Sequence, residues 1–249
     1  MDRLLELTCR AEQSHFWFRG FRRFVRPILD EAARSTRDGA RLLDCGCGTG
    51  ANLALLGDFG DAYGFDVTWQ GLRLAHSLGR RRVARASIAA IPFPSAHFHI
   101  ATSFDVFQCL PDAVEDDALR EMRRVLEPGG HLVMTVAALE ILRGSHAALS
   151  QEVRRYSKPR LRELLEEAGF RIERLTFANT SLLPIMLPLR LLQRWSSNGA
   201  PSAGELEITV PARPINAVLS GLLALESAAL RHVDMPFGSS LLCHARRID

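Results

Sequence analysis

The sequence is short of lysine: Lys158 is the only one, so arginine carries nearly all of the positive charge. Its 31 basic residues are almost balanced by 28 acidic ones, and the formal net charge is only +3. Arginines cluster at a few places, but acidic residues elsewhere offset them, which is more typical of solvated helix faces than of a polybasic surface. We therefore do not expect nucleic acid to be the partner.

Cysteine is also scarce, and its spacing excludes two kinds of site. The five cysteines are an odd number, widely spread along the chain. The only close pair, Cys45 and Cys47, has one residue between its members, so it is neither a CxxC redox motif nor half of a zinc site. The pattern predicts reduced thiols, no metal site and a cytoplasmic protein.

Long apolar runs are absent too. No run reaches the roughly 18 residues that a membrane span requires. The longest greasy stretch, 182–192, is broken by Pro184, Pro188 and Arg190. The first dozen residues mix acids and bases and lack the apolar core of a signal peptide. We expect no transmembrane segment.

Between about 40 and 137, short apolar runs alternate with amphipathic stretches, as in a parallel α/β sheet. The expected strands are 41–45, 62–65, 82–86, 98–103 and 131–136. The expected helices between them are about 50–57, 69–78 and 112–126. The Glu-Pro-Gly-Gly run at 127–130 is expected to stop the last helix and turn the chain into the next strand.

The regions that flank this core are also predicted to be ordered. Beyond it we expect a helix at 158–168, a strand at 170–177, a helix at about 215–230 and a final strand at 239–245. No break in composition justifies a second independent domain, so we expect one domain over 1–249. Its parts are an N-terminal helical lid (1–36), a cofactor-binding core (40–177), an apolar helical insertion or cap (178–236) and a terminal strand (237–249).

A glycine-rich turn at 44–50, Asp-Cys-Gly-Cys-Gly-Thr-Gly, follows the first buried strand and leads into a helix. Glycine permits the tight turn and lets a ligand approach the backbone closely. Amides at the start of the helix favour an anionic ligand group, most plausibly a carboxylate, and Asp44 can accept hydrogen bonds from loop amides or a ligand ammonium. Asp66, about twenty residues on, is placed to bind ribose hydroxyls.

Two alternatives to this interpretation stay open. Gly46-x-Gly48-x-x-Ala51 also fits the dinucleotide-binding fingerprint, and a purely structural strand–turn–helix would need no ligand at all. The acid two residues before the first glycine, together with the rest of the chain, favours a different nucleoside cofactor.

The ordered motifs resemble those of class I S-adenosylmethionine (SAM)-dependent methyltransferases over roughly 40–177. The turn resembles their first motif and Gly64-Phe65-Asp66 their second. Ile91-Pro92-Phe93-Pro94, the stretch 105–112 (DVFQCLPD) and the stretch 119–130 (LREMRRVLEPGG) are similar to later ones. Near the N-terminus, Glu12-x-x-His15-Phe16-Trp17-Phe18-Arg19 is similar to a bacterial subgroup of methyltransferase type 11 proteins, as is Arg154-Arg155-Tyr156.

The resemblance implies an α/β fold with a Rossmann-like seven-stranded sheet whose last strand is antiparallel. It implies SAM as cofactor and S-adenosylhomocysteine (SAH) as product. The glycines would approach the methionine part of SAM, Asp44 its ammonium, Asp66 the ribose and Ile88 the adenine. The implied cofactor-binding residues are Asp44, Gly46, Cys47, Gly48, Gly50, Asp66, Val67, Ser87, Ile88, Ser103 and Phe104.

The chain departs from the family pattern in three places. Ser87 replaces the acid that commonly binds the adenine amino group, so adenine recognition must depend more on backbone and packing. Gln108-Cys109 replaces the usual Glu-His pair, which removes one candidate base. His99 stands where an aspartate is usual.

Methyl transfer from a sulfonium depends mainly on positioning, and a general base is needed only for a poor nucleophile such as a hydroxyl. The candidate catalytic residues are His146, in the loop after the fifth core strand, and His15, in the aromatic N-terminal segment. Trp17, Arg154 and Tyr156 are candidate substrate-binding residues. For each, the alternative is a structural role: a loop histidine, an aromatic packed on the core, or a solvated helix start.

We therefore expect a SAM-dependent methyltransferase acting on a small-molecule acceptor, with O-methylation in a biosynthetic pathway favoured. The alternatives are an RNA methyltransferase and a non-catalytic SAM- or nucleotide-binding partner subunit. Against a nucleic-acid substrate, the stretch 103–106 lacks the Asn/Asp-Pro-Pro-aromatic motif that holds a flipped base. The apolar segments 181–192 and 215–230 favour an apolar acceptor pocket or a homodimer face, with peripheral membrane contact as a further alternative.

Overall fold

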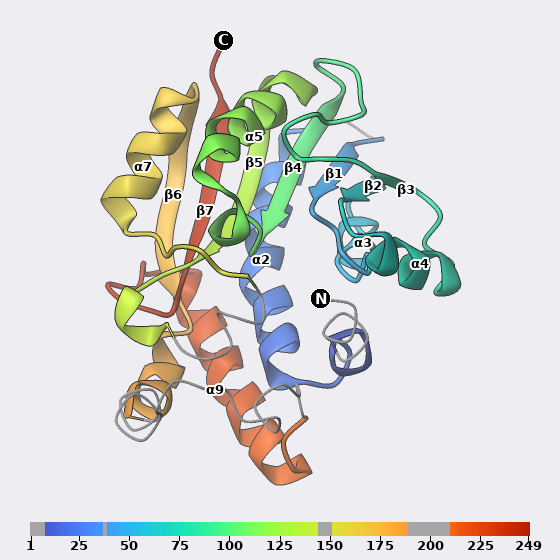
Figure 1. The fold of residues 1–249 in the computed structure, drawn as a ribbon. Coiled ribbons are helices and arrows are strands. Elements are labelled where there is room, and N and C mark those ends of the chain that lie inside the picture. The colour runs from blue at the N-terminus through green and yellow to red at the C-terminus, as the bar shows by residue number, and fades with distance from the viewer. Residues whose placement is uncertain (1–7, 37–38, 144–150, 189–209) are drawn as a thin grey trace.

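The computed structural model describes residues 8–36, 39–143, 151–188 and 210–249. Its strands form one seven-stranded sheet in the order β3-β2-β1-β4-β5-β7-β6 (Figure 1). β7 is antiparallel to both of its neighbours, whereas the pairs from β3 to β5 are parallel. The expected Rossmann-like α/β fold class, with an antiparallel last strand, is confirmed.

The elements lie close to the positions that the sequence predicts. The strands are β1 (Arg41–Cys45), β2 (Asp61–Asp66), β3 (Val83–Arg85), β4 (Phe98–Phe104), β5 (Leu126–Ala137), β6 (Phe170–Ala178) and β7 (Ser240–Arg247). The helices are α2 (Phe16–Arg34), α3 (Leu53–Leu56), α4 (Trp69–Ser77), α5 (Asp112–Val125), α7 (Lys158–Glu167) and α9 (Arg213–Leu230). Short 3-10 turns are η1 (Phe107–Cys109), η2 (Glu140–Leu142) and η3 (Thr180–Leu182).

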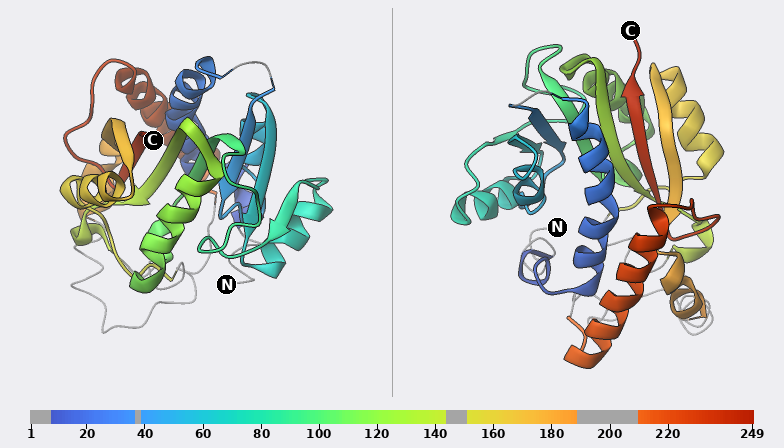
Figure 2. Two further views of the ribbon diagram at one scale, coloured as in Figure 1. Left: turned by 90° about the horizontal axis from the view of Figure 1, so that it is seen from above. Right: turned by 180° about the vertical axis from the view of Figure 1, so that it is seen from behind.

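Helices cover both faces of the sheet, because successive strand residues point to opposite sides. On one face, sheet residues that include Leu43 and Leu132 pack against α5 and α7. On the other, Leu42 and Val133 pack against α2 and α9. Figure 2 shows these two layers of helices with the sheet between them. The core is therefore buried from both sides, and the loops at the carboxyl ends of the parallel strands remain to build a site.

Two boundaries differ from the sequence expectation. β5 begins at Leu126, so the Glu-Pro-Gly-Gly run is part of an irregular strand rather than a separate turn. The pairing with β4 shifts register there, from Phe98 opposite Leu126 to Ile100 opposite His131, which accommodates the extra residues as a bulge. α3 is shorter than expected, because the glycine loop continues as turns until Leu53.

The N-terminal helix α2 and the late helix α9 pair with each other across one face of the sheet. A Cβ on Gly20 would lie 2.3 Å from Leu223 Cδ1, so the Leu223 side chain packs directly on the glycine backbone. Asn216 Oδ1 accepts a hydrogen bond from Phe16 N (2.8 Å), and Ser227 Oγ donates one to the Arg23 carbonyl (2.9 Å). The regions expected to form a lid and a cap therefore meet, although these two roles stay predictions. No helix in the described parts of the chain is long and apolar enough to cross a membrane.

Two buried histidines join the far end of α2 to the sheet. Ser35 Oγ donates to the Ala32 carbonyl (2.7 Å), so toward His131 Nε2 (2.6 Å) it acts as acceptor. In the neutral ring, His131 Nδ1 then accepts from His244 Nε2 (2.9 Å), and His244 Nδ1 has no hydrogen-bond partner. Burial favours this neutral form of the pair. Desolvation lowers the pKa of His131 to about 4 and also lowers the pKa of His244.

This pair predicts a loss of stability in mild acid. Above the ordinary histidine pKa of 6.5, neither the folded nor the unfolded chain carries the proton. As the pH falls from 6.5 toward 4, these histidines become protonated in the unfolded state but stay neutral in the folded state. The free energy of unfolding therefore decreases. We expect His131→Gln to unfold with a smaller difference between its urea midpoints at pH 7 and pH 5 than the wild type. The exposed His232, replaced in the same way, is the control. Equal pH dependence in both variants would contradict the prediction.

Candidate functional site

The glycine loop leaves β1 and turns under the end of β2. The amides of Gly46 and Cys47 both donate to the Phe65 carbonyl at 2.9 Å. Gly46 and Gly48 have φ of +85° and +53°, a region that side-chain-bearing residues rarely adopt. A Cβ on Gly46 would also lie 2.5 Å from Val106 Cγ2. The loop is thus packed directly against the turn that follows β4.

Asp66, at the end of β2, holds the loop in place. Its Oδ2 accepts from the Gly48 amide (2.7 Å), and its Oδ1 accepts from Thr68 N (2.7 Å) and Thr68 Oγ1 (2.5 Å). An ionised carboxylate offers about four acceptor positions, so one further hydrogen bond remains possible without breaking these. The predicted contact with a ribose hydroxyl is compatible with this arrangement and stays a prediction.

Asp44 is buried beneath the loop, with 1% of its surface exposed. Its Oδ1 accepts from Thr102 Oγ1 (2.9 Å), but its Oδ2 has no hydrogen-bond partner. Desolvation raises the pKa of Asp44 to about 7, the charge of Asp66 adds to the rise, and the Thr102 bond opposes it. A buried, unpartnered carboxylate oxygen is the kind of group that a ligand ammonium would satisfy.

A cavity of about 200 Å³ lies over the loop. The cavity is lined by aromatic side chains of α2, by the glycine loop and by the end of β4. Phe104 of β4 packs edge-on against Phe21 of α2 (4.9 Å between ring centroids). The lining residues are Thr8, Glu12, Trp17, Phe18, Phe21, Arg22, Gly46, Cys47, Gly48, Thr49, Ala51, Asn52, Phe104 and Asp105. The structure therefore brings together Trp17, three residues of the glycine loop and Phe104 from the predicted set.

The N-terminal segment is fastened to the loop by Glu12. The hydroxyl of Thr49 lies 2.8 and 3.1 Å from the two carboxylate oxygens of Glu12, and the Arg22 guanidinium donates to the Glu12 carbonyl (2.7 Å). Burial raises the pKa of Glu12, although Arg80 and Arg22 act in the opposite direction. Neither Glu12 nor Arg22 was predicted as a site residue from the sequence. The only signal was the place of Glu12 in the N-terminal motif.

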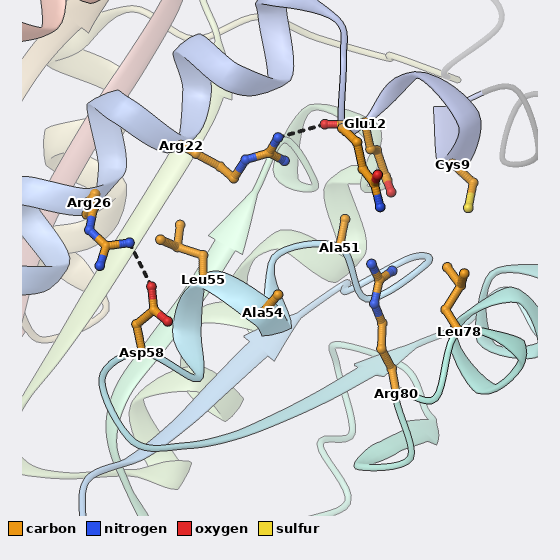
Figure 3. A pocket seen from close by; sticks show the side chains of 11 residues that line it. Cys9, Glu12, Arg22, Arg26, Ala51, Ala54, Leu55, Asp58, Leu78 and Arg80 are labelled. Carbon is orange, nitrogen blue, oxygen red and sulfur yellow. Dashed lines mark hydrogen bonds and ion pairs between the residues drawn. The ribbon is translucent and has the colours of Figure 1, made fainter.

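A second cavity of about 360 Å³ lies behind the loop, between α2, α3 and the connection from α4 to β3. Figure 3 shows Arg22 and Arg80 approaching it from different elements, with Arg26 paired to Asp58 (2.7 Å) beside them. Its lining residues are Cys9, Glu12, Gln13, Arg22, Arg26, Ala51, Ala54, Leu55, Asp58, Leu78 and Arg80. Since Glu12, Arg22 and Ala51 line both cavities, the two are neighbours across the N-terminal segment.

Several predicted cofactor residues lie near the loop but do not line the first cavity. Gly50 has φ of +72°, and its amide donates to the Cys47 carbonyl (2.7 Å). Ser103 is fully buried, and its hydroxyl has no partner. At the adenine side, Val67 and Ser87 are exposed, whereas Ile88 is buried in the core.

Of the two histidines predicted as catalytic residues, the structure describes His15 but not His146. His15 is the N-cap of α2, where its Nδ1 accepts from the Trp17 amide (3.1 Å). That nitrogen is therefore occupied, and desolvation lowers the pKa of the ring. Both features work against a role as proton acceptor. His146 lies outside the described residues.

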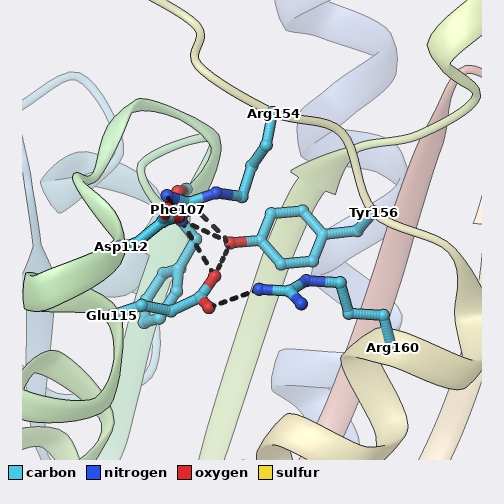
Figure 4. Close-up of polar contacts among 6 residues, drawn as sticks. All are labelled: Phe107, Asp112, Glu115, Arg154, Tyr156 and Arg160. Atoms are coloured by element: carbon cyan, nitrogen blue, oxygen red, sulfur yellow. Dashed lines mark hydrogen bonds and ion pairs between the residues drawn. The ribbon is translucent and has the colours of Figure 1, made fainter.

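The candidate substrate-binding residues Arg154 and Tyr156 are placed in a separate cluster around the buried Glu115 (Figure 4). Glu115 accepts from the Tyr156 hydroxyl, from Arg154 (3.0 Å) and from Arg160 (2.8 Å). Neither Arg154 nor Tyr156 is among the residues that line the cavity over the glycine loop. Their observed contacts are internal and join the segment before α7 to α5.

The site thus fits a nucleoside that carries an amino acid. Asp44 supplies an unpartnered buried acceptor under the loop. At Gly48, no atom lies within 4 Å of the position a Cβ would occupy, so the backbone is open toward a ligand. Asp66 ends the neighbouring strand, where parallel α/β sheets bind the ribose of such ligands.

Comparison with known proteins agrees with this geometry. The family described as "Methyltransferase domain" matches residues 43–134, from β1 to β5. The chain is 31% identical over 147 residues to the ubiquinone/menaquinone biosynthesis C-methyltransferase UbiE of Edwardsiella ictaluri (strain 93-146), which covers 53% of this chain and 56% of that protein. The chain therefore spans little more than half the length of this curated relative.

Solved structures share the fold at low sequence identity. One is a putative sarcosine dimethylglycine methyltransferase from Galdieria sulphuraria, with a TM-score of 0.58, 18% identity, and coverage of 90% of this chain and 86% of that one. Another is a geranyl diphosphate C-methyltransferase from Streptomyces coelicolor A3(2), solved with Mg²⁺, geranyl diphosphate and SAH. Its TM-score is 0.56, its identity 13%, and the coverage 90% and 76%. These likenesses concern the fold alone.

Proposed function

We propose that this chain, which is similar to methyltransferases in sequence and in fold, is a class I SAM-dependent methyltransferase that transfers a methyl group from SAM to a small-molecule acceptor. The observation that carries the proposal is the cavity over the glycine loop, with an unpartnered Asp44 oxygen beneath it. SAM when bound supplies an electrophilic methyl group on a sulfonium, with SAH as the product.

The chain's own residues then have separate tasks. Asp44 accepts from the ammonium of the cofactor, Asp66 binds its ribose, and the glycines at 46 and 48 let its amino-acid part lie against the backbone. The aromatic side chains of α2 exclude water from the reacting side, with Trp17 able to face the cation. Arg22, on the same cavity, can pair with a carboxylate of the cofactor or the acceptor.

The acceptor class follows from the shape and charge of this cavity. The aromatic side chains of α2 beside the proposed cofactor position suit a flat or apolar small molecule. Oxygen is the acceptor atom we favour, although the curated relative is a C-methyltransferase. A homodimer, or contact with a membrane surface, would use the apolar residues that α9 exposes, which include Ile215, Val218 and Leu225. Location in the cytoplasm is part of the proposal, because all five cysteines are free thiols.

Calorimetry provides the first test. We expect SAH to bind at least ten-fold more tightly than NAD, which corresponds to about 1.4 kcal/mol. Transfer of a labelled methyl group from SAM to phenols, amines and activated carbon acids then identifies the acceptor atom. A preference for NAD would overturn the cofactor assignment. Binding of SAH with no transfer to any of these acceptors would favour a non-catalytic partner subunit instead.

A further inference from the structure

Asp105 lies at the carboxyl end of β4, directly against the glycine loop. It lines the cavity over that loop, and its neighbour Val106 packs on Gly46. Asp105 has φ of +56°, a left-handed conformation that is uncommon for a residue with a side chain. Backbone strain of this kind concentrates at functional sites, because the surrounding structure must hold it in place. The sequence analysis placed Asp105 at the start of the family-like stretch 105–112 but did not name it among the candidate site residues.

The side chain of Asp105 is oriented by neutral donors. Thr135 Oγ1, from the adjacent strand β5, donates to Asp105 Oδ1 (3.2 Å), and the side chain of Gln108 also hydrogen-bonds the carboxyl. The Asp105 amide donates to the Thr135 carbonyl (3.0 Å), so main chain and side chain are fastened to the same residue. The carboxyl group is thereby fixed toward the cavity without being neutralised.

The charged groups around Asp105 leave it free to take a proton. Arg155 contributes a positive charge near Asp105, but Arg155 is paired with Glu152 (2.6 Å) and donates to the Ala138 carbonyl (3.0 Å). Glu12 and Arg22 line the same cavity as Asp105. Within the described residues, Asp105 forms no ion pair. Desolvation and the charge of Glu152 raise its pKa, while Thr135, Gln108 and Arg155 oppose the rise.

Asp105 is exposed and lines the cavity over the glycine loop, so a ligand in that cavity can reach its carboxylate. A general base needs this access to the acceptor together with a pKa closer to neutrality than that of a free aspartate. In His15, the ring nitrogen that could take a proton already accepts a hydrogen bond from the Trp17 amide.

We propose that Asp105 is the general base that removes the proton from a hydroxyl acceptor during methyl transfer. The inference rests on the proposed function, since it requires SAM as the methyl donor. The acceptor O–H bond breaks and its proton passes to the Asp105 carboxylate. The oxygen lone pair forms the new bond to the methyl carbon, and the electron pair of the breaking carbon–sulfur bond goes to sulfur. The products are the methyl ether, neutral SAH and a protonated Asp105, which returns its proton to solvent.

The test compares Asp105→Asn with the wild type on two phenols. 4-Methylphenol is un-ionised near neutral pH and needs a base, whereas 4-nitrophenol is already largely ionised at slightly alkaline pH and does not. We expect the variant to methylate 4-methylphenol about 100-fold more slowly, within the range that a positioned base contributes. Its rate with 4-nitrophenol should change less than about 3-fold at pH 8. Asp116→Asn, an exposed carboxylate on α5, is the matched control and should leave both rates unchanged.

A second readout does not depend on turnover. In a complex with SAH, the wild-type Asp105 carboxylate should repel a bound phenolate, so 4-nitrophenol should ionise at lower pH in Asp105→Asn than in the wild type. The absorbance of bound 4-nitrophenol measures this ionisation directly. Equal losses with both phenols, or no shift in ionisation, would overturn the base role.

The remaining outcomes separate this inference from the proposed function. If Asp105→Asn loses affinity for SAH, then Asp105 is a cofactor contact rather than a base. If the wild type binds SAH but methylates neither phenol, the proposal of a hydroxyl acceptor fails. The proposal that Asp105 is its general base then fails with it. If the wild type does not bind SAH at all, the proposed function itself fails.

Discussion

Gly48→Leu is expected to weaken SAH binding at least 100-fold, a loss of about 2.7 kcal/mol. Two features of the structure produce this effect. The Gly48 backbone lines the cavity over the glycine loop, and the space where a side chain would begin is empty of protein atoms. A leucine there would occupy the volume that the ligand needs. Calorimetric titration with SAH measures the change.

Backbone strain alone must be separated from this steric effect, because φ at Gly48 is +53° and a side chain there costs about 1–2 kcal/mol of stability. Gly39 is the matched control. It has φ of +89°, has no atom within 4 Å of its Cβ position, and does not line the cavity. Gly39→Leu should lower the melting temperature by a similar amount and leave SAH affinity unchanged. Comparable affinities in the two variants would contradict the placement of the cofactor over the loop.

Glu115→Gln is expected to destabilise the protein by about 3 kcal/mol, the lower end of the range for a broken buried ion pair. Only 5% of the Glu115 side chain is exposed, and its two oxygens accept from the Tyr156 hydroxyl and from Arg154 and Arg160. The glutamine amide offers only one acceptor oxygen, and its NH₂ group faces cationic donors. Arg160 then loses its carboxylate partner, and Arg154 keeps only its ion pair with the exposed Asp112. For a chain of this size the melting temperature should fall by about 10 °C.

A surface pair provides the control for this second prediction. Glu166, on α7, pairs with Arg162 at 3.3 Å, and both side chains are about half exposed. Glu166→Gln should change stability by less than about 0.5 kcal/mol, because water and salt screen such pairs. If Glu115→Gln melts at the same temperature as Glu166→Gln, the buried cluster does not stabilise the fold as we infer.

The Glu115 cluster also supports the site indirectly. It fixes the segment that precedes α7, and within that segment the amide of Val153 donates to the Gln108 carbonyl (2.8 Å). Gln108 in turn hydrogen-bonds Asp105. The family-like Arg-Arg-Tyr stretch thus contributes to the shape of the turn after β4, whether or not it ever touches an acceptor.

Sequence periodicity was sufficient for the parallel core. β1 was predicted with its observed ends, and α5 and α9 were each predicted to within two residues of their observed bounds. The pattern succeeded because alternation and amphipathic spacing reflect which side of the local backbone is buried. It failed at the Glu-Pro-Gly-Gly run, where a bulge in the sheet kept the residues within β5 although their composition is typical of a turn.

By itself, the sequence determined the strand–turn–helix of the glycine loop, because the turn needs residues with positive φ and glycine adopts this conformation readily. It also placed Asp44 next to the end of the first core strand and Asp66 at the end of the second. Only the tertiary structure decided which distant side chains meet there: Glu12 on Thr49, Asp105 beside the glycine loop, and Arg154 with Glu115 instead of the cavity. The physical reason is that hydrophobic periodicity records whether a residue is buried, but its partner depends on strand order and register, which join residues far apart in the chain.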